Sequence, residues 1–253
     1  MNLKEEKSVN TEVRNLVDFH THLLPGIDDG SSSIETTLAM LEAAAEQGIG
    51  AMIATPHFYP EEESPQFFLK RRRAACSQLL TVYDPNIHPA VYLGAEVAFF
   101  SGIGHSRIIR ELAVLGTDVI LVEMPFSEWT ASTVEEIYFL RESLGLIPVI
   151  AHVERYAKYQ KRGTLKKLIA NGALIQSNAN YFIDPKNSKK ALKQFRHGDI
   201  NVLGSDTHNM TSRPQNLKQA VSLIAENGGG KELERMDMLG KFLLENAIRI
   251  DLQ

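Results

Sequence analysis

Short apolar runs alternate along the chain with longer segments in which apolar residues recur at helical spacing. Several runs follow directly on a helical segment that closes in glycine, and these runs are 49–55, 146–152, 173–177 and 200–205. The runs are almost continuously apolar, as is typical of parallel strands that helices cover. The pattern therefore predicts a repeated unit of helix, glycine, strand and loop.

The helix before the first of these runs illustrates the helical pattern. Ile34, Leu38, Leu41 and Ala45 recur at helical spacing, and the serines at 31–33 offer side chains that can cap the N-terminus. One face of this helix is expected to pack on the sheet. The same reasoning predicts helices over 130–144, 164–171, 186–197 and 213–227.

Alternating strands and helices imply parallel pairing with right-handed crossovers. Seven apolar strands are predicted in all, which favours an α/β fold with a closed or nearly closed barrel. At 253 residues and 43% hydrophobic content, the chain is long enough for one sizeable core. We expect a polar N-terminal extension over residues 1–15 and a single domain over 16–253.

Residues that bind metal or phosphate follow the C-terminal ends of the predicted strands, where barrels of this kind place their active sites. The ends read Asp18-Phe19-His20-Thr21-His22, Thr55-Pro56-His57, Gly94-Ala95-Glu96, Val122-Glu123, Ala151-His152-Val153-Glu154-Arg155, Ser177-Asn178 and Ser205-Asp206-Thr207-His208. Imidazoles and carboxylates gathered at one edge are typical of a divalent-metal hydrolase.

Two pairs with a spacing of two residues give the strongest metal signal. His20 and His22 point to the same side of a strand end, and Asp206 and His208 repeat the arrangement at the last strand. His57 follows a Thr-Pro step that fixes the direction of the chain. All five residues are expected to be ligands.

Carboxylates complete the expected ligand set. Glu96 and Glu123 end otherwise apolar strands, where an unpaired carboxylate would be costly to bury, and His152 follows the same logic. Asp29 lies in a glycine-flanked loop and is expected to fold back over the barrel mouth, whereas its competitor Asp28 is more readily explained as a turn residue.

Asp18 is not counted as a ligand, because it is expected to point out of the barrel interior or to orient a ligating imidazole. Nine residues are therefore expected to be ligands, and each has an imidazole or a carboxylate in its side chain: His20, His22, Asp29, His57, Glu96, Glu123, His152, Asp206 and His208. That number exceeds the needs of one or two ions and suits a cluster of three.

Two arginines lie just beyond these ligands. Arg155 follows His152 and Arg213 follows His208, and a guanidinium offers a planar fork of donors for phosphate or carboxylate oxygens. Surface salt bridges are the alternative for both. The basic run 70–73 is expected to be a solvated helix face.

The composition of the chain argues against several classes of protein. A net charge of −4 and a pI near 6.1 provide no broad basic footprint, so nucleic acid is not an expected partner. No apolar stretch reaches membrane-spanning length, and the N-terminus has no apolar signal region. Cys76 is the only cysteine, which excludes intrachain disulfides and fits a reducing, cytoplasmic location.

The motifs together resemble the PHP (polymerase and histidinol phosphatase) superfamily. They are Asp-x-His-x-His-x-Leu-Pro-Gly-x-Asp-Asp-Gly at 18–30, Ala-Thr-Pro-His at 54–57, Gly-Ala-Glu at 94–96, Val-Ile-Ala-His-Val-Glu-Arg-Tyr at 149–156 and Ser-Asp-Thr-His-Asn at 205–209. More narrowly, the Asp-Asp-Gly and His-x-Glu-Arg elements resemble the manganese-dependent protein-tyrosine phosphatases of the CpsB/CapC group. The resemblance runs from about Leu16 to the C-terminus.

This resemblance implies a distorted (β/α)7 TIM-like barrel, the PHP fold, with three divalent metal ions. It assigns one ion to His20, His22, Glu96 and Asp206, a second to Glu96, Glu123 and His152, and a third to Asp29, His57 and His208. Arg155 and Arg213 match the arginines that hold phosphate in that family. The implied partner is the phosphotyrosine-containing tail of a tyrosine kinase that regulates capsule or exopolysaccharide synthesis.

Other functions stay open at this point. Manganese is implied by the resemblance, but His and carboxylate ligands also accept Fe, Zn or Co. A small-molecule phosphatase of the histidinol-phosphatase type, a metal-dependent amidohydrolase and a metal-dependent regulatory protein are alternatives. A cysteine-dependent tyrosine phosphatase is excluded, because Val82 stands six residues after Cys76 where that chemistry needs arginine.

Aromatic residues in two loops bear on substrate choice. The loops 58–68 and 125–130 are expected to overhang the barrel mouth, and they contribute Phe58, Tyr59, Phe67, Phe68, Phe126 and Trp129. An aromatic rim would favour an aryl phosphate. The alternative is that Phe67 and Phe68 pack a helix against the barrel.

Overall fold

The computed structural model describes residues 16–252. The expected N-terminal extension, residues 1–15, lies outside the described residues, as does residue 253. Within 16–252, strands and helices alternate along most of the chain, and every pairing between strands is parallel. The predicted α/β class with a parallel sheet is therefore confirmed.

The strands form two sheets. The first has the order β1-β2-β4, with β1 at Leu16–Thr21, β2 at Ile49–Ala54 and β4 at Ala90–Leu93. The second has the order β3-β5-β6-β7-β8-β9, with bounds His57–Phe58, Glu96–Ala98, Val119–Glu123, Ile147–Ile150, Leu174–Asn178 and Val202–Gly204.

Two short links join the sheets into one curved surface. The chain passes from β2 into β3 and from β4 into β5 within a few residues, and the Glu96 amide donates to the carbonyl of Pro56 at 3.0 Å across this step. At the other edge the Asp206 amide donates to the His20 carbonyl at 2.8 Å, and the His22 amide donates to the Thr207 carbonyl at 2.9 Å. The segment after β9 therefore lies directly beside β1.

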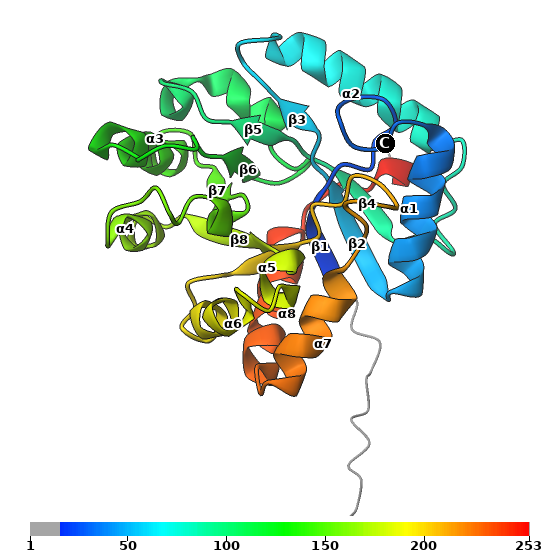
Figure 1. The fold of residues 1–253 in the computed structure, drawn as a ribbon. Coiled ribbons are helices and arrows are strands. Elements are labelled where there is room, and N and C mark those ends of the chain that lie inside the picture. The colour runs from blue at the N-terminus through cyan, green and yellow to red at the C-terminus, as the bar shows by residue number, and fades with distance from the viewer. Residues whose placement is uncertain (1–15, 253) are drawn as a thin grey trace, which may run out of the picture.

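The helices lie on the outside of this curved sheet (Figure 1). Their bounds are α1 Ile34–Glu46, α2 Pro65–Leu79, α3 Ala131–Glu142, α4 Thr164–Ala170, α5 Ala179–Ile183, α6 Ser188–Arg196, α7 Leu217–Glu226 and α8 Gly230–Leu243. Short 3₁₀ turns, η1 to η4, span Ile103–His105, Arg107–Leu112, Val153–Arg155 and Ile250–Leu252.

The sequence signals for helix ends are confirmed. The Ser33 hydroxyl accepts a hydrogen bond from the Thr36 amide at 3.3 Å and caps α1. All four glycines predicted to close helices have positive φ, as this termination requires: Gly48, Gly145, Gly172 and Gly198. Two helices, α5 and α8, have no counterpart among the predicted elements.

The basic run 70–73 is not simply a solvated face. Arg72 on α2 is buried, and its Nη1 donates to the Gly94 carbonyl at 2.7 Å in the link between β4 and β5. Arg71 contacts Glu63 and the Ile27 carbonyl. The prediction fails for Arg71 and Arg72 because each contacts a backbone carbonyl oxygen outside the helix. Arg71 contacts that of Ile27, and Arg72 contacts that of Gly94.

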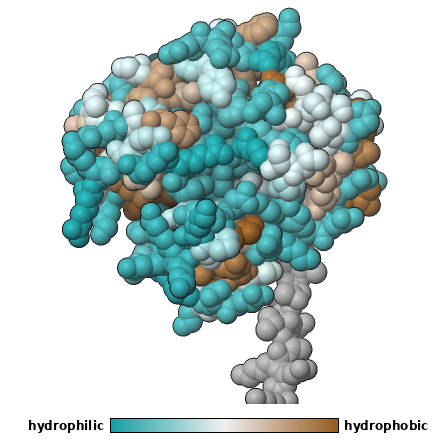
Figure 2. Space-filling model, in the orientation of Figure 1, coloured by the Kyte–Doolittle hydropathy of each residue, from teal (hydrophilic) through white to brown (hydrophobic). Residues whose placement is uncertain are grey.

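The visible surface is mainly hydrophilic, with hydrophobic residues in separate patches (Figure 2). Among residues 16–252, no helix combines the length and the apolar character needed to cross a bilayer.

Candidate metal centre

The carboxyl ends of the strands bring all nine expected ligands to one place. His20 lies in β1 and His22 just after it, His57 begins β3, Glu96 begins β5 and Glu123 ends β6. The remaining members follow strands or lie in a loop: Asp29, His152, Asp206 and His208. Imidazole and carboxylate atoms from eight of these residues, all except His152, form three overlapping groups, each close enough to hold an ion.

The first group contains His20, His22 and Asp206. The Nε2 atoms of the two histidines lie 3.0 Å apart, and Asp206 Oδ1 lies 3.6 Å and 3.5 Å from them. Glu96 Oε2 lies 3.2 Å from His20 Nε2 and 3.4 Å from His22 Nε2. Separations of about 3 to 3.5 Å fit donors that share one ion at roughly 2.1 Å each. This group contains three residues of the first expected ligand set, and the fourth, Glu96, lies beside it.

The second group is centred on Glu96. Its Oε2 lies 3.0 Å from His57 Nδ1, and its Oε1 lies 2.8 Å from His152 Nε2. Glu123 Oε1 lies 3.5 Å from the same His152 atom. Glu96 therefore contacts histidines from three strand ends. The donors close enough to hold one ion here are His57, Glu96 and Glu123, so His57 stands where the expected second set has His152, which contacts Glu96 from outside the group. His57 also belongs to the third group.

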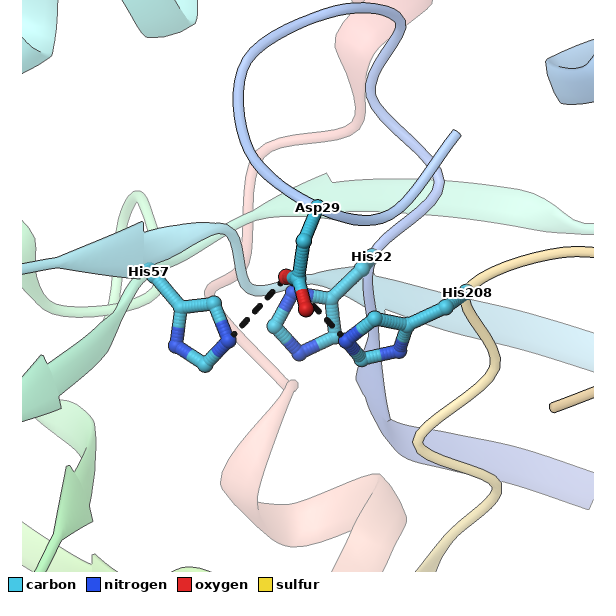
Figure 3. A group of neighbouring side chains, drawn as sticks. All are labelled: His22, Asp29, His57 and His208. Carbon is cyan, nitrogen blue, oxygen red and sulfur yellow. Dashed lines mark ion pairs between the residues drawn. The ribbon is translucent and has the colours of Figure 1, made fainter. Parts of the chain in front are cut away.

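The third group surrounds Asp29, whose loop lies over the mouth (Figure 3). Its Oδ1 lies 3.4 Å from His57 Nε2 and 3.4 Å from His208 Nε2, so the carboxylate lies between the two rings. The His22 ring lies beside the same carboxylate (Figure 3).

Neighbouring oxygens orient three of the imidazoles. Nδ1 of His20 lies 3.3 Å from Gln176 Oε1, Nδ1 of His22 lies 2.8 Å from Asp28 Oδ2, and Nδ1 of His208 lies 2.9 Å from the Asp206 carbonyl. An acceptor at Nδ1 places the proton there and leaves the Nε2 lone pair directed into the centre. The donor set therefore fits divalent metal ions.

The sequence did not predict Gln176 as a residue that supports the centre. It lies within β8, and its Oε1 also accepts from the His152 amide at 2.6 Å, while its Nε2 donates to Asn178 Oδ1. The feature that could have indicated this role is a glutamine in the middle of the predicted strand 173–177, because a buried amide needs hydrogen-bond partners.

Asp28 does more than the expected turn residue. It accepts from the amides of Gly30 and His57 at 3.0 and 3.1 Å, besides its contact with His22. Asp18 stays outside the nine donors, as expected, but its carboxylate contacts backbone amides and a glutamine side chain rather than an imidazole ring. Its carboxylate accepts from the Ser205 amide at 2.8 Å and from Gln215 Nε2 at 2.7 Å, which holds β1 against the last strand end.

The backbone is strained at two of the expected ligands. His152 has φ 26° and Asp206 has φ 55°, and no other described residue except glycine has positive φ. Strained backbone of this kind is concentrated at functional sites, where the surrounding structure holds it. Gly204 permits close approach here, because a Cβ at that position would lie 2.5 Å from the His20 Cβ.

Several side chains in the centre have pKa values shifted away from their ordinary values. Burial, together with the neighbouring charge of Glu96, raises the pKa of Glu123 to about 7. Burial would lower the pKa of His22, but hydrogen bonds with Asp28 and Glu96 raise it to about 10. Burial and the neighbouring His22 lower the pKa of His208 to about 4. Such opposed shifts in a strand-end cluster are typical of a functional site.

Arg155 and Arg213 meet at the rim. Arg155 Nη2 donates to Asp206 Oδ2 at 2.6 Å, Arg213 Nη2 forms an ion pair with the same oxygen at 2.5 Å, and Asn178 Nδ2 donates to it at 2.8 Å. Asp206 therefore directs one oxygen to the imidazoles and the other to the arginines. Both guanidinium groups remain about one third exposed, so they can also reach a ligand at the mouth.

The expected aromatic rim is only partly present. Phe58 and Phe68 are buried against each other with ring centroids 5.4 Å apart, so Phe68 packs α2 onto the barrel as in the alternative reading. Trp129 is also buried, and its Nε1 donates to the Pro125 carbonyl. These rings turn inwards because the loops that carry them need apolar anchors.

Two aromatic side chains do lie beside the centre. The Tyr59 ring stacks on His57 with centroids 5.1 Å apart, and Phe126 stacks on His152 at 6.3 Å. Phe126 is half exposed, whereas Tyr59 is less so. They lie beside histidines from different strand ends, so both rings are next to the centre.

A comparison with known families decides between the alternatives. The family described as capsular polysaccharide synthesis, CpsB/CapC, matches residues 16–249. The chain belongs to the CpsB/CapC family. The prediction made from the motifs is confirmed.

Relatives in the CpsB/CapC family carry phosphatase names. The tyrosine-protein phosphatase YwqE of Bacillus subtilis is 31% identical over 244 residues, which cover 92% of this chain and 90% of YwqE. The tyrosine-protein phosphatase CpsB of Streptococcus pneumoniae is 28% identical over 256 residues, which cover 92% of this chain and all of CpsB.

Solved structures agree with the family. A structure reported with YwqE and CpsB, described as unique metal-dependent tyrosine phosphatases, has a TM-score of 0.78 at 26% identity and covers 92% of this chain and 97% of its own. An amidohydrolase structure has a TM-score of 0.51 at 12% identity, covering 98% of this chain and 81% of its own. That second likeness shows the shared fold alone.

Proposed function

We propose that this chain is a metal-dependent protein-tyrosine phosphatase. Membership of the CpsB/CapC family supports the reaction, and the observation that carries it is the convergence of nine imidazole and carboxylate side chains beside two arginines. The only cysteine, Cys76, is buried in α2, away from the nine donors, and burial raises the pKa of its thiol. It is therefore not the nucleophile.

The fold proposal is a distorted (β/α)7 barrel that forms one domain over residues 16–253. β2 with β3 and β4 with β5 would each count as one bent strand, and the backbone hydrogen bonds between β1 and residues 206–207 would close the ring. This arrangement accounts for donors that come from every direction around the mouth.

The donors would hold three divalent ions, with manganese as the expected metal and Fe, Zn or Co as alternatives. The proposed ligand sets are His20, His22, Glu96 and Asp206, then Glu96, Glu123 and His152, then Asp29, His57 and His208. Ions held by these residues would supply Lewis acidity, which would activate water near neutral pH and polarise the phosphoryl group.

Arg155 and Arg213 are the proposed phosphate-binding residues. Their fork-shaped donors suit phosphate oxygens, and their positive charge offsets the negative charge that develops on those oxygens during hydrolysis. The leaving group is a phenolate, whose pKa of about 10 makes protonation a weak demand. No dedicated general acid is needed among the described residues.

The proposed physiological substrate is the phosphotyrosine-containing tail of a bacterial tyrosine kinase that regulates capsule or exopolysaccharide synthesis. The capsular description of the family supports this assignment. A cytoplasmic location would place the chain with such a tail.

A metal-reconstituted activity screen tests the proposal. We expect hydrolysis of a phosphotyrosine peptide at least about tenfold faster, in kcat/KM, than hydrolysis of a matched phosphoserine peptide or histidinol phosphate. A chelator should abolish turnover, and Mn²⁺ should restore it. Cys76→Ser should retain full activity as a control for thiol chemistry. A preference for histidinol phosphate would replace the proposal with the small-molecule phosphatase, and activity that survives metal removal would refute both.

Tyr59 and Phe126 are expected to favour an aryl substrate. Tyr59→Ala and Phe126→Ala should each lower kcat/KM for a phosphotyrosine peptide by roughly three- to tenfold, because each ring can contribute on the order of 0.5–1.5 kcal/mol to an aromatic contact. Hydrolysis of a small alkyl phosphate should change much less. Phe67→Ala, on the exposed side of α2, is the matched control. Equal losses on both substrates would mean that the two rings only support the histidines.

A further inference from the structure

A hollow of about 430 Å³ lies beside the metal centre, between the loop after η3 and helices α4, α5 and α6. Its inner wall is aromatic and aliphatic, formed by Trp129, Tyr156, Tyr181, Leu165 and Ile169. Trp129, Tyr156 and Tyr181 are each less than one tenth exposed. The hollow therefore offers an apolar floor that can receive a ring.

Cations gather at the rim of this hollow. Lys161, Arg162, Lys166 and Lys190 line it, and all four side chains are exposed. Within the part of the chain that the structure describes, Lys161 pairs with Glu128, whereas Arg162, Lys166 and Lys190 form no ion pair. The surface over α3 and α4, at the left of Figure 2, is accordingly a mixture of hydrophilic and hydrophobic residues.

This local charge contrasts with the rest of the chain. Residues 158–167 contain five cations and no carboxylate, although the whole chain has a net charge of −4. Two carboxylates, Glu154 and Asp199, do line the hollow. Glu154 already accepts from Ser177 Oγ at 3.0 Å and from the Asn178 amide, so its oxygens have partners. With four cations against two carboxylates, the lining of the hollow has a net positive charge, which attracts anions.

One side chain separates the hollow from the metal centre. The Tyr156 ring lies 5.3 Å from the Trp129 ring in the hollow and 5.4 Å from the His152 ring in the centre, measured between centroids. The η3 turn also lies between the hollow and the centre, because Val153 and Glu154 line the hollow while Arg155 donates to Asp206 in the centre. A peptide that places one side chain in the mouth can therefore place a neighbouring side chain in the hollow.

We propose that this hollow binds a second phosphotyrosine of the peptide whose first phosphotyrosine enters the metal centre. The ring would lie on the apolar floor and the phosphate would meet Arg162, Lys166 and Lys190 at the rim, where charge-assisted hydrogen bonds are favourable. The hollow holds this group without hydrolysing it, since none of the nine metal-type donors lines it. The inference deepens the proposed function, because it concerns the substrate of the same centre.

The first experiment compares two peptides on the metal-loaded enzyme, one with a single phosphotyrosine and one with a second phosphotyrosine a few residues away. The doubly phosphorylated peptide should have a KM about tenfold lower. Arg162→Glu combined with Lys166→Glu should remove this advantage and leave kcat/KM for p-nitrophenyl phosphate unchanged. The matched control is Lys158→Glu with Lys193→Glu, which changes the charge equally outside the hollow. An advantage that survives the first double variant would overturn the proposal.

The second experiment does not depend on turnover. Trp129 is the only tryptophan of the chain and lies in the wall of the hollow, so its fluorescence reports directly on an occupant. A peptide with two non-hydrolysable phosphonomethyl-phenylalanine residues should change this fluorescence, and a peptide with one such residue should do so only at about tenfold higher concentration. A glutamate in place of the second residue that binds equally well would overturn the assignment of an aryl group. If hydrolysis fails but the fluorescence response remains, the proposed function fails and the binding site stands.

Discussion

Replacing Asp206 by asparagine is expected to abolish phosphotyrosine hydrolysis while the chain still folds. Asp206 supplies one oxygen to His20 and His22 and the other to Arg155 and Arg213, so the change removes charge from both halves of the site. Asparagine is chosen because it tolerates the positive φ of this position better than alanine does. We expect kcat/KM to fall by roughly 10³-fold or more, with fewer metal equivalents per chain.

The measurements are kcat/KM, elemental analysis of the purified protein and circular dichroism. His20→Ala should give the same loss, since its Nε2 lies at the same group of donors. Asp118→Asn, at an exposed carboxylate on the protein surface, is the control for an acidic residue changed elsewhere. Wild-type turnover in Asp206→Asn, or metal content below one equivalent in the wild-type protein, would remove the proposed centre.

The second large effect concerns the two arginines. Arg155→Ala and Arg213→Ala should each lower kcat/KM by roughly 10²-fold, because each removes a positive charge aimed at the phosphate oxygens in the transition state. Metal content should stay unchanged, which separates phosphate binding from support of Asp206. Arg107→Ala, at an exposed residue of η2, should have no effect.

Conservative variants sharpen the second test. Arg155→Lys and Arg213→Lys retain the charge but lose the fork of donors, so their activity should lie between wild type and alanine. Losses within twofold for both alanine variants would leave the arginines as salt-bridge partners of Asp206. A loss of metal in either variant would likewise assign them to ligand positioning.

Much of the fold could be predicted because its signals are local. Glycines with positive φ mark four helix ends, and apolar runs mark strands such as β2 and β7. The division of β2 from β3 and of β4 from β5 could not be read in this way, because it depends on pairing between distant segments. Helix α8 also escaped prediction, because it packs against β1, a strand more than 200 residues earlier in the chain.

The donor atoms were easier to predict than the residues that support them. For an imidazole or a carboxylate at a strand end, the residue type and its position are enough to predict a metal ligand, as with His20 and Glu96. Gln176 and Asp28 have many ordinary roles, and only the folded geometry shows that they fix the protons of His20 and His22. The inward rotation of Trp129 was likewise invisible, because an aromatic residue in a loop packs inwards or outwards according to its neighbours.

The contact between β1 and the segment after β9 means that the centre joins the two ends of the fold. His20 and His208 lie almost the whole length of the domain apart in sequence, yet backbone hydrogen bonds hold their strand ends together. A cation that binds this donor set in the folded chain and does not bind the unfolded chain would add about 2.7 kcal/mol to the free energy of unfolding at a concentration of 100 times its Kd. During synthesis the set of nine donors is incomplete until residue 208 has been made, so the full set exists only late in the synthesis of the chain. A chain truncated before Asp206 lacks the closing backbone contacts and the donors Asp206 and His208, so added metal should raise its thermal unfolding temperature less than that of the full chain.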